Sequence, residues 1–178
     1  MRIDKTSLNI RKMTAASFFA AVIAITAQFA IPLPSGFPFT LQTFAVCLCG
    51  YCLGVKNSLL SVAVYILIGA VGAPVFGGFQ GGIHHLAGFT GGFIIGFLPM
   101  AALCGAGRTR KGAVAVLCGV CGIVCCHILG TLWYSFVAGT GIEEAFVLVL
   151  TFFALKDIAS CIAAFAVSGI LNRILRLC

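Results

Sequence analysis

The segment Pro32-Leu-Pro-Ser-Gly-Phe-Pro-Phe39, followed by Thr40-Leu41-Gln42-Thr43, interrupts an otherwise apolar chain. Three prolines and a glycine this close together do not fit inside a helix, because proline lacks the backbone N–H and restricts the residue before it. In lipid, unpaired backbone is tolerated only where protein or a water-filled cavity covers it. The segment therefore predicts either a loop at the membrane surface or a cap over a binding cavity.

The composition is that of an integral membrane protein. The chain has 178 residues, of which 61% are hydrophobic and 8% are charged, whereas about 25% of the residues of a soluble domain are charged. The net charge of +7 is a property of many nucleic-acid-binding proteins. Here, however, the basic residues form short clusters between apolar stretches, so we expect the lipid bilayer as a partner and no nucleic acid.

Apolar windows are the primary signal for transmembrane helices. The first window extends to Ile31, too far for a cleavable signal peptide, whose apolar region spans roughly 7–15 residues. We therefore expect an all-α integral membrane protein, a compact bundle of six transmembrane helices forming a single domain over residues 1–178. The expected spans are 13–31, 41–55, 58–73, 86–105, 113–138 and 145–171.

The basic residues divide the connections between these spans into two classes. With six alternating spans, every Lys and Arg except Lys156 falls on one side, and the connections 32–40, 74–85 and 139–144 contain none. Because cytoplasmic loops are enriched in Lys and Arg, both termini are expected to be cytoplasmic, in a multi-pass protein of the plasma (inner) membrane. The residues on this side are Arg2, Lys5, Arg11, Lys12, Lys56, Arg108, Arg110, Lys111, Arg173 and Arg176.

Lys156 and Asp157 lie within the last span. Ionisable groups at membrane depth are costly and usually face a cavity or a partner. Because neighbours on a helix point about 100° apart, we expect Asp157 to face a ligand while Lys156 extends to the outer surface. The alternative is a purely structural pair at the interface.

The stretch 74–93 is rich in glycine and phenylalanine. Glycine permits unusual backbone angles, and the aromatic content suits a movable lid over an apolar ligand better than a flexible linker. His84 and His85 lie in this stretch and are candidates for ligand contact or, less readily, for a metal site. Trp133 and Tyr134 suit an interfacial aromatic belt or stacking on a ligand ring.

Small residues recur at helical spacing. Ala16, Ala20 and Ala24 share one face of the first span, and such faces let helices approach closely or dock another protein. The cysteine pairs Cys49/Cys52 and Cys118/Cys121 have CxxC spacing, which occurs in zinc and redox sites. We interpret them as small apolar residues within helices, and we expect no metal.

Four motifs resemble one family, the BioY proteins, which are biotin-specific substrate-binding (S) components of energy-coupling factor (ECF) transporters. Residues 31–43, Ile-Pro-Leu-Pro-Ser-Gly-Phe-Pro-Phe-Thr-Leu-Gln-Thr, resemble the hallmark loop after the first helix. The later motifs are Gly69-Ala-Val-Gly-Ala-Pro-Val-Phe-Gly-Gly78, Gly88-Phe-Thr-Gly-Gly-Phe93 and Gly130-Thr-Leu-Trp133.

The resemblance implies a non-enzymatic protein that binds biotin at the outer face and delivers it inward. The implied partners are a transmembrane coupling protein, which would dock on Ala16, Ala20 and Ala24, and two ATPase subunits that use ATP; no cofactor of the chain itself is implied. A carboxylate such as Asp157 would accept the ureido N–H groups of biotin or pair with Lys156. The expected ligand-binding residues are Phe39, Thr40, Gln42, Phe76, His84, Thr90, Trp133, Tyr134, Lys156 and Asp157.

Two departures from the family pattern leave alternatives open. Phe89 stands where the family usually has proline, and Ser160 stands where it has a lysine, so that Lys156 is displaced by one helical turn. One alternative is an S component for another small vitamin. The other is an intramembrane, metal-dependent enzyme using His84, His85 and Asp157.

Overall fold

The computed structural model describes the backbone of residues 5–32 and 38–175, and the side chains of residues 10–31, 40–151 and 153–173. Within this part of the chain the expected all-α membrane class is confirmed. The one hairpin, Ile31↔Phe39 and Pro32↔Pro38, is antiparallel and two residues long on each side. The elements are α1 (Lys5–Gln28), β1 (Ile31–Pro32), β2 (Pro38–Phe39), α2 (Gln42–Ala70), α3 (Ile83–Ala87), α4 (Gly91–Gly107), α5 (Ala113–Ala138) and α6 (Ile142–Leu175).

The expectation of six transmembrane helices is wrong. Counting the parts of α2 before and after its break at Gly54, the described residues form seven helical segments. α4 is apolar but has only 17 residues, and α3 has five. Within the part of the chain that the structure describes, four segments are long and apolar enough to cross a membrane: Ile10–Gln28, Gln42–Ala70, Ala113–Ala138 and Phe153–Arg173.

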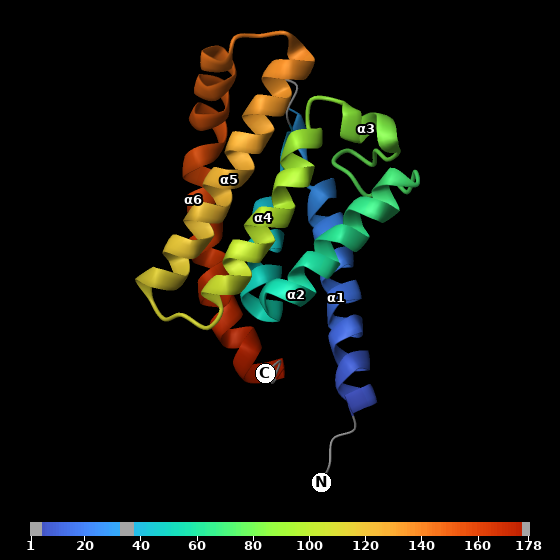
Figure 1. Ribbon diagram of the computed structural model, residues 1–178, viewed down its shortest axis with the longest axis vertical. Helices are drawn as coiled ribbons and strands as arrows, with labels where there is room; N and C mark the ends of the chain where they lie inside the picture. The colour runs from blue at the N-terminus through green and yellow to red at the C-terminus, as the bar shows by residue number, and fades with distance from the viewer. Residues whose placement is uncertain (1–4, 33–37, 176–178) are drawn as a thin grey trace.

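The error at spans 41–55 and 58–73 has a physical cause. The apolar windows end at Lys56-Asn57, which suggested a loop, yet α2 continues through both residues. The break lies at Gly54 instead, whose φ of 72° is a conformation that glycine adopts readily. Lys56 is exposed beside the break, and the amide of Asn57 donates to the carbonyl of Leu53 at 3.5 Å. Figure 1 shows α2 changing direction here and rising towards α3.

Apart from Lys156 and Asp157, the described charged residues lie in segments at the two ends of the bundle. The start of α1, the bend of α2, the α4–α5 connection and the end of α6 lie at one end, whereas α3 and the α5–α6 connection lie at the other (Figure 1). The first end carries Arg11, Lys56 and the basic residues after α4. Glu143 and Glu144, in the first turn of α6, lie at the opposite end.

Small residues allow the helices to approach closely. A Cβ added to Gly50 of α2 would lie 2.5 Å from Cys104 Cβ and 2.8 Å from the Ala101 carbonyl oxygen of α4. Such contacts leave room for little more than a hydrogen atom, which explains why small apolar residues, including cysteines, fill this core. The described cysteines are all free, and Cys47, Cys49, Cys52 and Cys104 are buried.

Replacing Gly50 by alanine should therefore destabilise the protein. The added methyl group meets backbone of α4, which has no rotamer with which to move aside, and overpacking of this kind costs about 1–3 kcal/mol. Thermal unfolding of the detergent-purified protein should show a midpoint several degrees below that of the wild type.

The matched control is Gly169→Ala in α6, where nothing lies within 4 Å of an added Cβ. This variant should unfold at or slightly above the wild-type temperature, because alanine favours helix more than glycine does. A Gly50→Ala protein as stable as Gly169→Ala would contradict the close α2–α4 contact.

Candidate ligand-binding site

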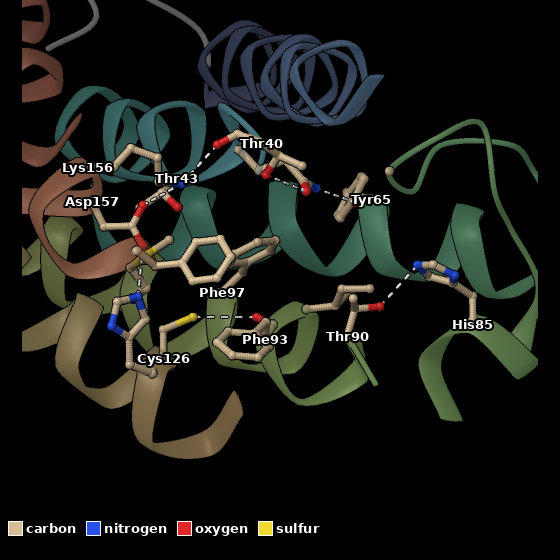
Figure 2. Close-up of a pocket in the computed structure, with 16 residues that line it drawn as sticks. Thr40, Thr43, Tyr65, His85, Thr90, Phe93, Phe97, Cys126, Lys156 and Asp157 are labelled. Atoms are coloured by element: carbon tan, nitrogen blue, oxygen red, sulfur yellow. Dashed lines mark hydrogen bonds and ion pairs between the residues drawn. The ribbon is translucent and has the colours of Figure 1, made fainter. Parts of the chain in front are cut away.

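A cavity of about 70 Å³ lies between α2, α4, α5 and α6. Figure 2 shows its two polar ends, with Lys156 and Asp157 at one and His85 and Thr90 at the other, and with Phe93 and Phe97 between them. The residues that line it are Thr40, Gln42, Thr43, Tyr65, Gly77, His85, Thr90, Phe93, Ile94, Phe97, Met100, Cys126, His127, Phe153, Lys156 and Asp157.

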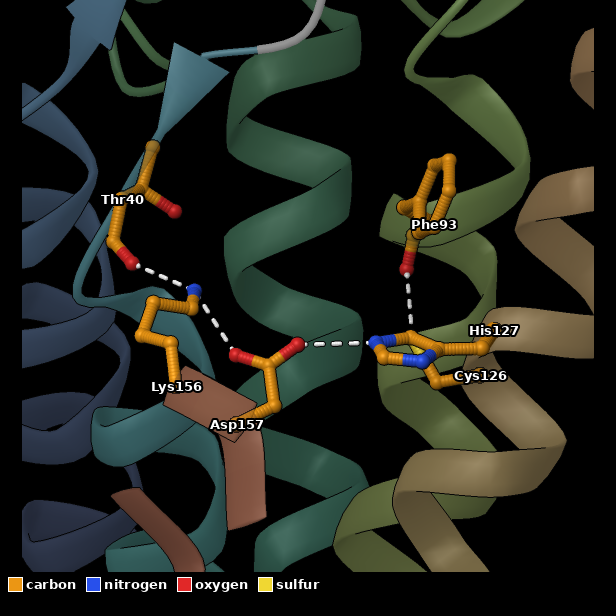
Figure 3. A network of polar contacts seen from close by, with 6 residues as sticks. All are labelled: Thr40, Phe93, Cys126, His127, Lys156 and Asp157. Atoms are coloured by element: carbon orange, nitrogen blue, oxygen red, sulfur yellow. Dashed lines mark hydrogen bonds and ion pairs between the residues drawn. The ribbon is translucent and has the colours of Figure 1, made fainter. Parts of the chain in front are cut away.

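The charged end of the cavity is organised by Asp157 (Figure 3). One carboxylate oxygen, Oδ1, lies 2.7 Å from Lys156 Nζ, and the other, Oδ2, lies 2.8 Å from His127 Nε2. The three side chains are only 15%, 4% and 12% exposed for Lys156, Asp157 and His127. Removing charges from water is costly unless each is paired and hydrogen-bonded, and this cluster meets that requirement across α5 and α6.

The expectation that Lys156 extends to the outer surface is wrong, because its side chain lines the cavity. Its ammonium donates to the Thr40 carbonyl oxygen at 2.9 Å, and lies 5.5 Å from the centroid of the Phe153 ring. The long side chain thus reaches the cavity lining. One cation thereby joins α6 to the residue that follows the β1–β2 hairpin.

A second polar group of residues continues from Thr40. Its hydroxyl donates to Gln42 Oε1 at 3.1 Å, and Gln42 Nε2 donates to the Tyr65 hydroxyl at 2.7 Å. All three residues are buried. Hydroxyl and amide groups held in this way fix the orientation of a ligand, while the apolar part of a pocket supplies buried area.

At the end of the cavity opposite Asp157 (Figure 2), which we call the lid end, a histidine stacks on an aromatic ring. His85 lies 5.1 Å from the Phe76 ring centroid at an interplanar angle of 16°, and its Nε2 is 3.2 Å from the Thr90 hydroxyl. Burial, and secondarily the nearby His84, lowers the pKa of His85. The ring therefore favours its neutral form, which has one nitrogen able to accept a hydrogen bond.

Five of the expected ligand-binding residues line the cavity, namely Thr40, Gln42, Thr90, Lys156 and Asp157. The others lie elsewhere or outside the described residues. Phe76 is fully buried behind the wall, His84 is exposed, Trp133 donates to the Gly88 carbonyl at 2.9 Å, Tyr134 packs edge-on against Phe89, and the side chain of Phe39 is not among those described.

The alanine stripe of α1 faces its own chain. Ala16 and Ala20 are buried and Ala24 is half-buried, and Ala20 belongs to the core cluster, with Ala24 packed against it. In this arrangement the stripe allows close packing within the bundle. Its use as a docking face for another protein stays a prediction.

Sequence reasoning missed His127, although a signal for it was present. A histidine within an apolar span is an ionisable group at membrane depth, which by itself indicates a functional position. Phe97 and Phe153 carried no comparable signal, because the chain has 16 phenylalanines and periodicity does not distinguish cavity-facing rings from lipid-facing ones.

The alternative of a metal-dependent enzyme required His84, His85 and Asp157 to converge. Asp157 pairs instead with His127 and Lys156, while His84 lies outside the cavity lining. Among the described residues, no group of three or more His, Cys, Asp or Glu side chains is placed to hold a metal ion.

Comparison with known proteins identifies the relatives of this chain. The model of the BioY family matches residues 3–177. A Pyrococcus horikoshii protein named "Probable biotin transporter BioY" is 35% identical over 157 residues, covering 88% of this chain and 93% of that protein. A Thermotoga maritima protein named "Biotin transporter BioY" is 40% identical over 129 residues, covering 71% and 76%.

A solved structure has the same fold. It is the crystal structure of the S-component for biotin from an ECF-type ABC transporter, which superimposes with a TM-score of 0.81 at 22% identity, covering 98% of this chain and 95% of that one. The resemblance inferred from the sequence motifs is thus confirmed by the family model, which spans nearly the whole chain. The chain belongs to the BioY family.

Proposed function

We propose that this chain binds biotin and acts as the substrate-binding S component of an ECF-type biotin uptake transporter. The main support for the proposal is the cavity. It has the buried Lys156–Asp157 pair at one end, and aromatic side chains line it. Membership of the BioY family, whose relatives are named as biotin transporters, supports biotin over other small vitamins.

The chemistry of the cavity suits the three parts of biotin. The ureido head needs hydrogen-bond donors and acceptors, which Thr40, Gln42 and Asp157 provide. The thiophane ring is apolar and suits the rings of Phe93 and Phe97. The valerate carboxylate is an anion, and it would lie away from the Lys156–Asp157 pair, because Asp157 would repel it and the two charged groups are only 2.7 Å apart.

We infer that the chain itself is not an enzyme and has no cofactor. The energy for uptake would come from partners, a transmembrane coupling protein and two ATPase subunits that hydrolyse ATP. This inference is supported by family membership and by the neighbour described as part of an ECF-type ABC transporter. The small-residue face of α1 remains the proposed docking face, and it would have to become accessible for that role.

We also propose that the protein lies in the plasma membrane with both termini cytoplasmic. The support is electrostatic, since the segments that carry the described basic residues other than Lys156 lie at the end of the bundle where α1 begins and α6 ends (Figure 1). Lys and Arg are enriched in cytoplasmic connections. In this orientation, α3 and the cavity's lid end face outward, where biotin would be captured.

Calorimetric titration should show one-to-one binding of biotin to the folded protein after endogenous ligand has been removed. Asp157→Asn should weaken binding by about tenfold or more, because it keeps the shape of the side chain but leaves the buried Lys156 ammonium without its counter-charge. Glu143→Gln is the matched control, since it removes the same charge from an exposed site at the start of α6.

The Glu143→Gln protein should bind biotin as the wild type does. If folded, ligand-free wild-type protein did not bind biotin, the proposed ligand would be wrong. If Asp157→Asn bound biotin as tightly as Glu143→Gln, the carboxylate would have no part in recognition.

Reporter fusions test the orientation. Alkaline phosphatase fused after Cys178 should be inactive, since it would remain in the cytoplasm, whereas green fluorescent protein at the same place should fluoresce. Alkaline phosphatase inserted at Gly141, in the α5–α6 connection, should be active. The reverse pattern would show that the termini lie outside.

A further inference from the structure

Gln28, the last residue of α1, is bonded through its side chain to a loop that is distant in sequence. Its Nε2 donates to the Phe76 carbonyl oxygen at 3.2 Å, and its Oε1 accepts from the Phe79 N–H at 2.8 Å. Nε2 also lies 3.0 Å from the Ala24 carbonyl oxygen within α1. The one amide therefore joins α1 to both ends of the segment 76–79.

That segment is a tight turn with an unusual backbone. Phe76 N–H donates to the Gln80 carbonyl oxygen at 2.9 Å. Gly78 and Phe79 have φ values of 72° and 58°, and Phe79 is the only described residue other than glycine with a positive φ. A phenylalanine in this conformation is strained and persists only where its surroundings impose it. The hydrogen bond from Phe79 N–H to Gln28 is one such constraint.

The turn places Phe76 behind the cavity wall. Its side chain is fully buried, stacks on His85 and meets Tyr65 edge-on at 5.6 Å. The ring of Phe76 packs against Gly69 and occupies the space that a Cβ at this position would need. His85 and Tyr65 both line the cavity, and Tyr65 accepts a hydrogen bond from Gln42. Phe76 thus supports both the lid and the polar wall.

We propose that Gln28 is a positioning residue that fixes the 76–79 turn to α1 and thereby sets how long a ligand remains in the cavity. The inference rests on the proposed function, because it concerns the same cavity. Gln28 does not touch the cavity and acts through Phe76. A displacement of α1 relative to α2 must either carry the turn with it or break both hydrogen bonds, so α1 and the lid are mechanically linked.

The first test needs no ligand. Gln28→Met keeps the length of the side chain and removes both hydrogen bonds to the turn. Thr26→Val is the matched control, because the Thr26 hydroxyl bonds only to carbonyls of its own helix, those of Val22 and Ile23. Amide hydrogen exchange of ligand-free protein should be about tenfold faster over residues 76–87 in Gln28→Met than in Thr26→Val.

The second test measures residence time. Radiolabelled biotin should dissociate from Gln28→Met about tenfold faster than from Thr26→Val in a chase with excess unlabelled biotin, although the two variants unfold within a few degrees of each other. Equal dissociation rates would overturn the proposal. So would equal hydrogen exchange over 76–87.

The two tests separate the failure of this inference from that of the proposed function. If the wild type bound no biotin, the proposed function would fail, and the hydrogen-exchange comparison would still decide whether Gln28 holds the turn. If biotin bound and both comparisons showed no difference, the proposed function would stand and the role of Gln28 would be excluded.

Discussion

The structure depends on how the Lys156–Asp157 ion pair is stabilised within apolar helices. A lysine, an aspartate and a histidine in apolar helices are costly unless they meet one another or water. Here Asp157 satisfies both others, at 2.7 Å and 2.8 Å, and Lys156 also bonds to the backbone that follows the β1–β2 hairpin. This requirement brings α5, α6 and the start of α2 to one place. The cavity forms beside the cluster, with these charged groups at one end and His85 and Thr90 at the other (Figure 2).

The second constraint is volume. The helices approach through glycine, alanine and cysteine, so a few large side chains decide where space remains. Phe76 illustrates this, since it fills the space left by the missing side chain of Gly69 and supports two cavity-lining residues at once. The 76–79 turn, which carries Phe76, is hydrogen-bonded to Gln28 at the end of α1. Packing at the α3 end of the bundle is therefore continuous with the wall of the cavity.

Much of the site was predictable from the sequence, and the misses have physical reasons. Thr40, Gln42 and Thr90, which the family resemblance implied, line the cavity. Lys156 and Asp157 also line it, as expected of ionisable groups in apolar spans, which need a cavity or a partner. Hydropathy identified the chain as an apolar α-helical membrane protein but predicted six spans, and it mistook Lys56-Asn57 for a loop, because the bend lies at Gly54 and depends on backbone angles rather than composition. The 100° spacing of helix neighbours wrongly separated Lys156 from Asp157, because a long, flexible lysine side chain can still reach its neighbour's carboxylate. Which phenylalanines face the cavity depends on tertiary packing alone.

The central claim is that biotin occupies the cavity beside Asp157. The most direct measurement is anomalous diffraction from crystals grown with selenobiotin, in which selenium replaces the sulfur of the thiophane ring. We expect one selenium peak inside the cavity, enclosed by the rings of Phe93 and Phe97 and within the reach of a biotin molecule whose ureido head meets Asp157. A selenium peak outside the residues that line the cavity would contradict this claim.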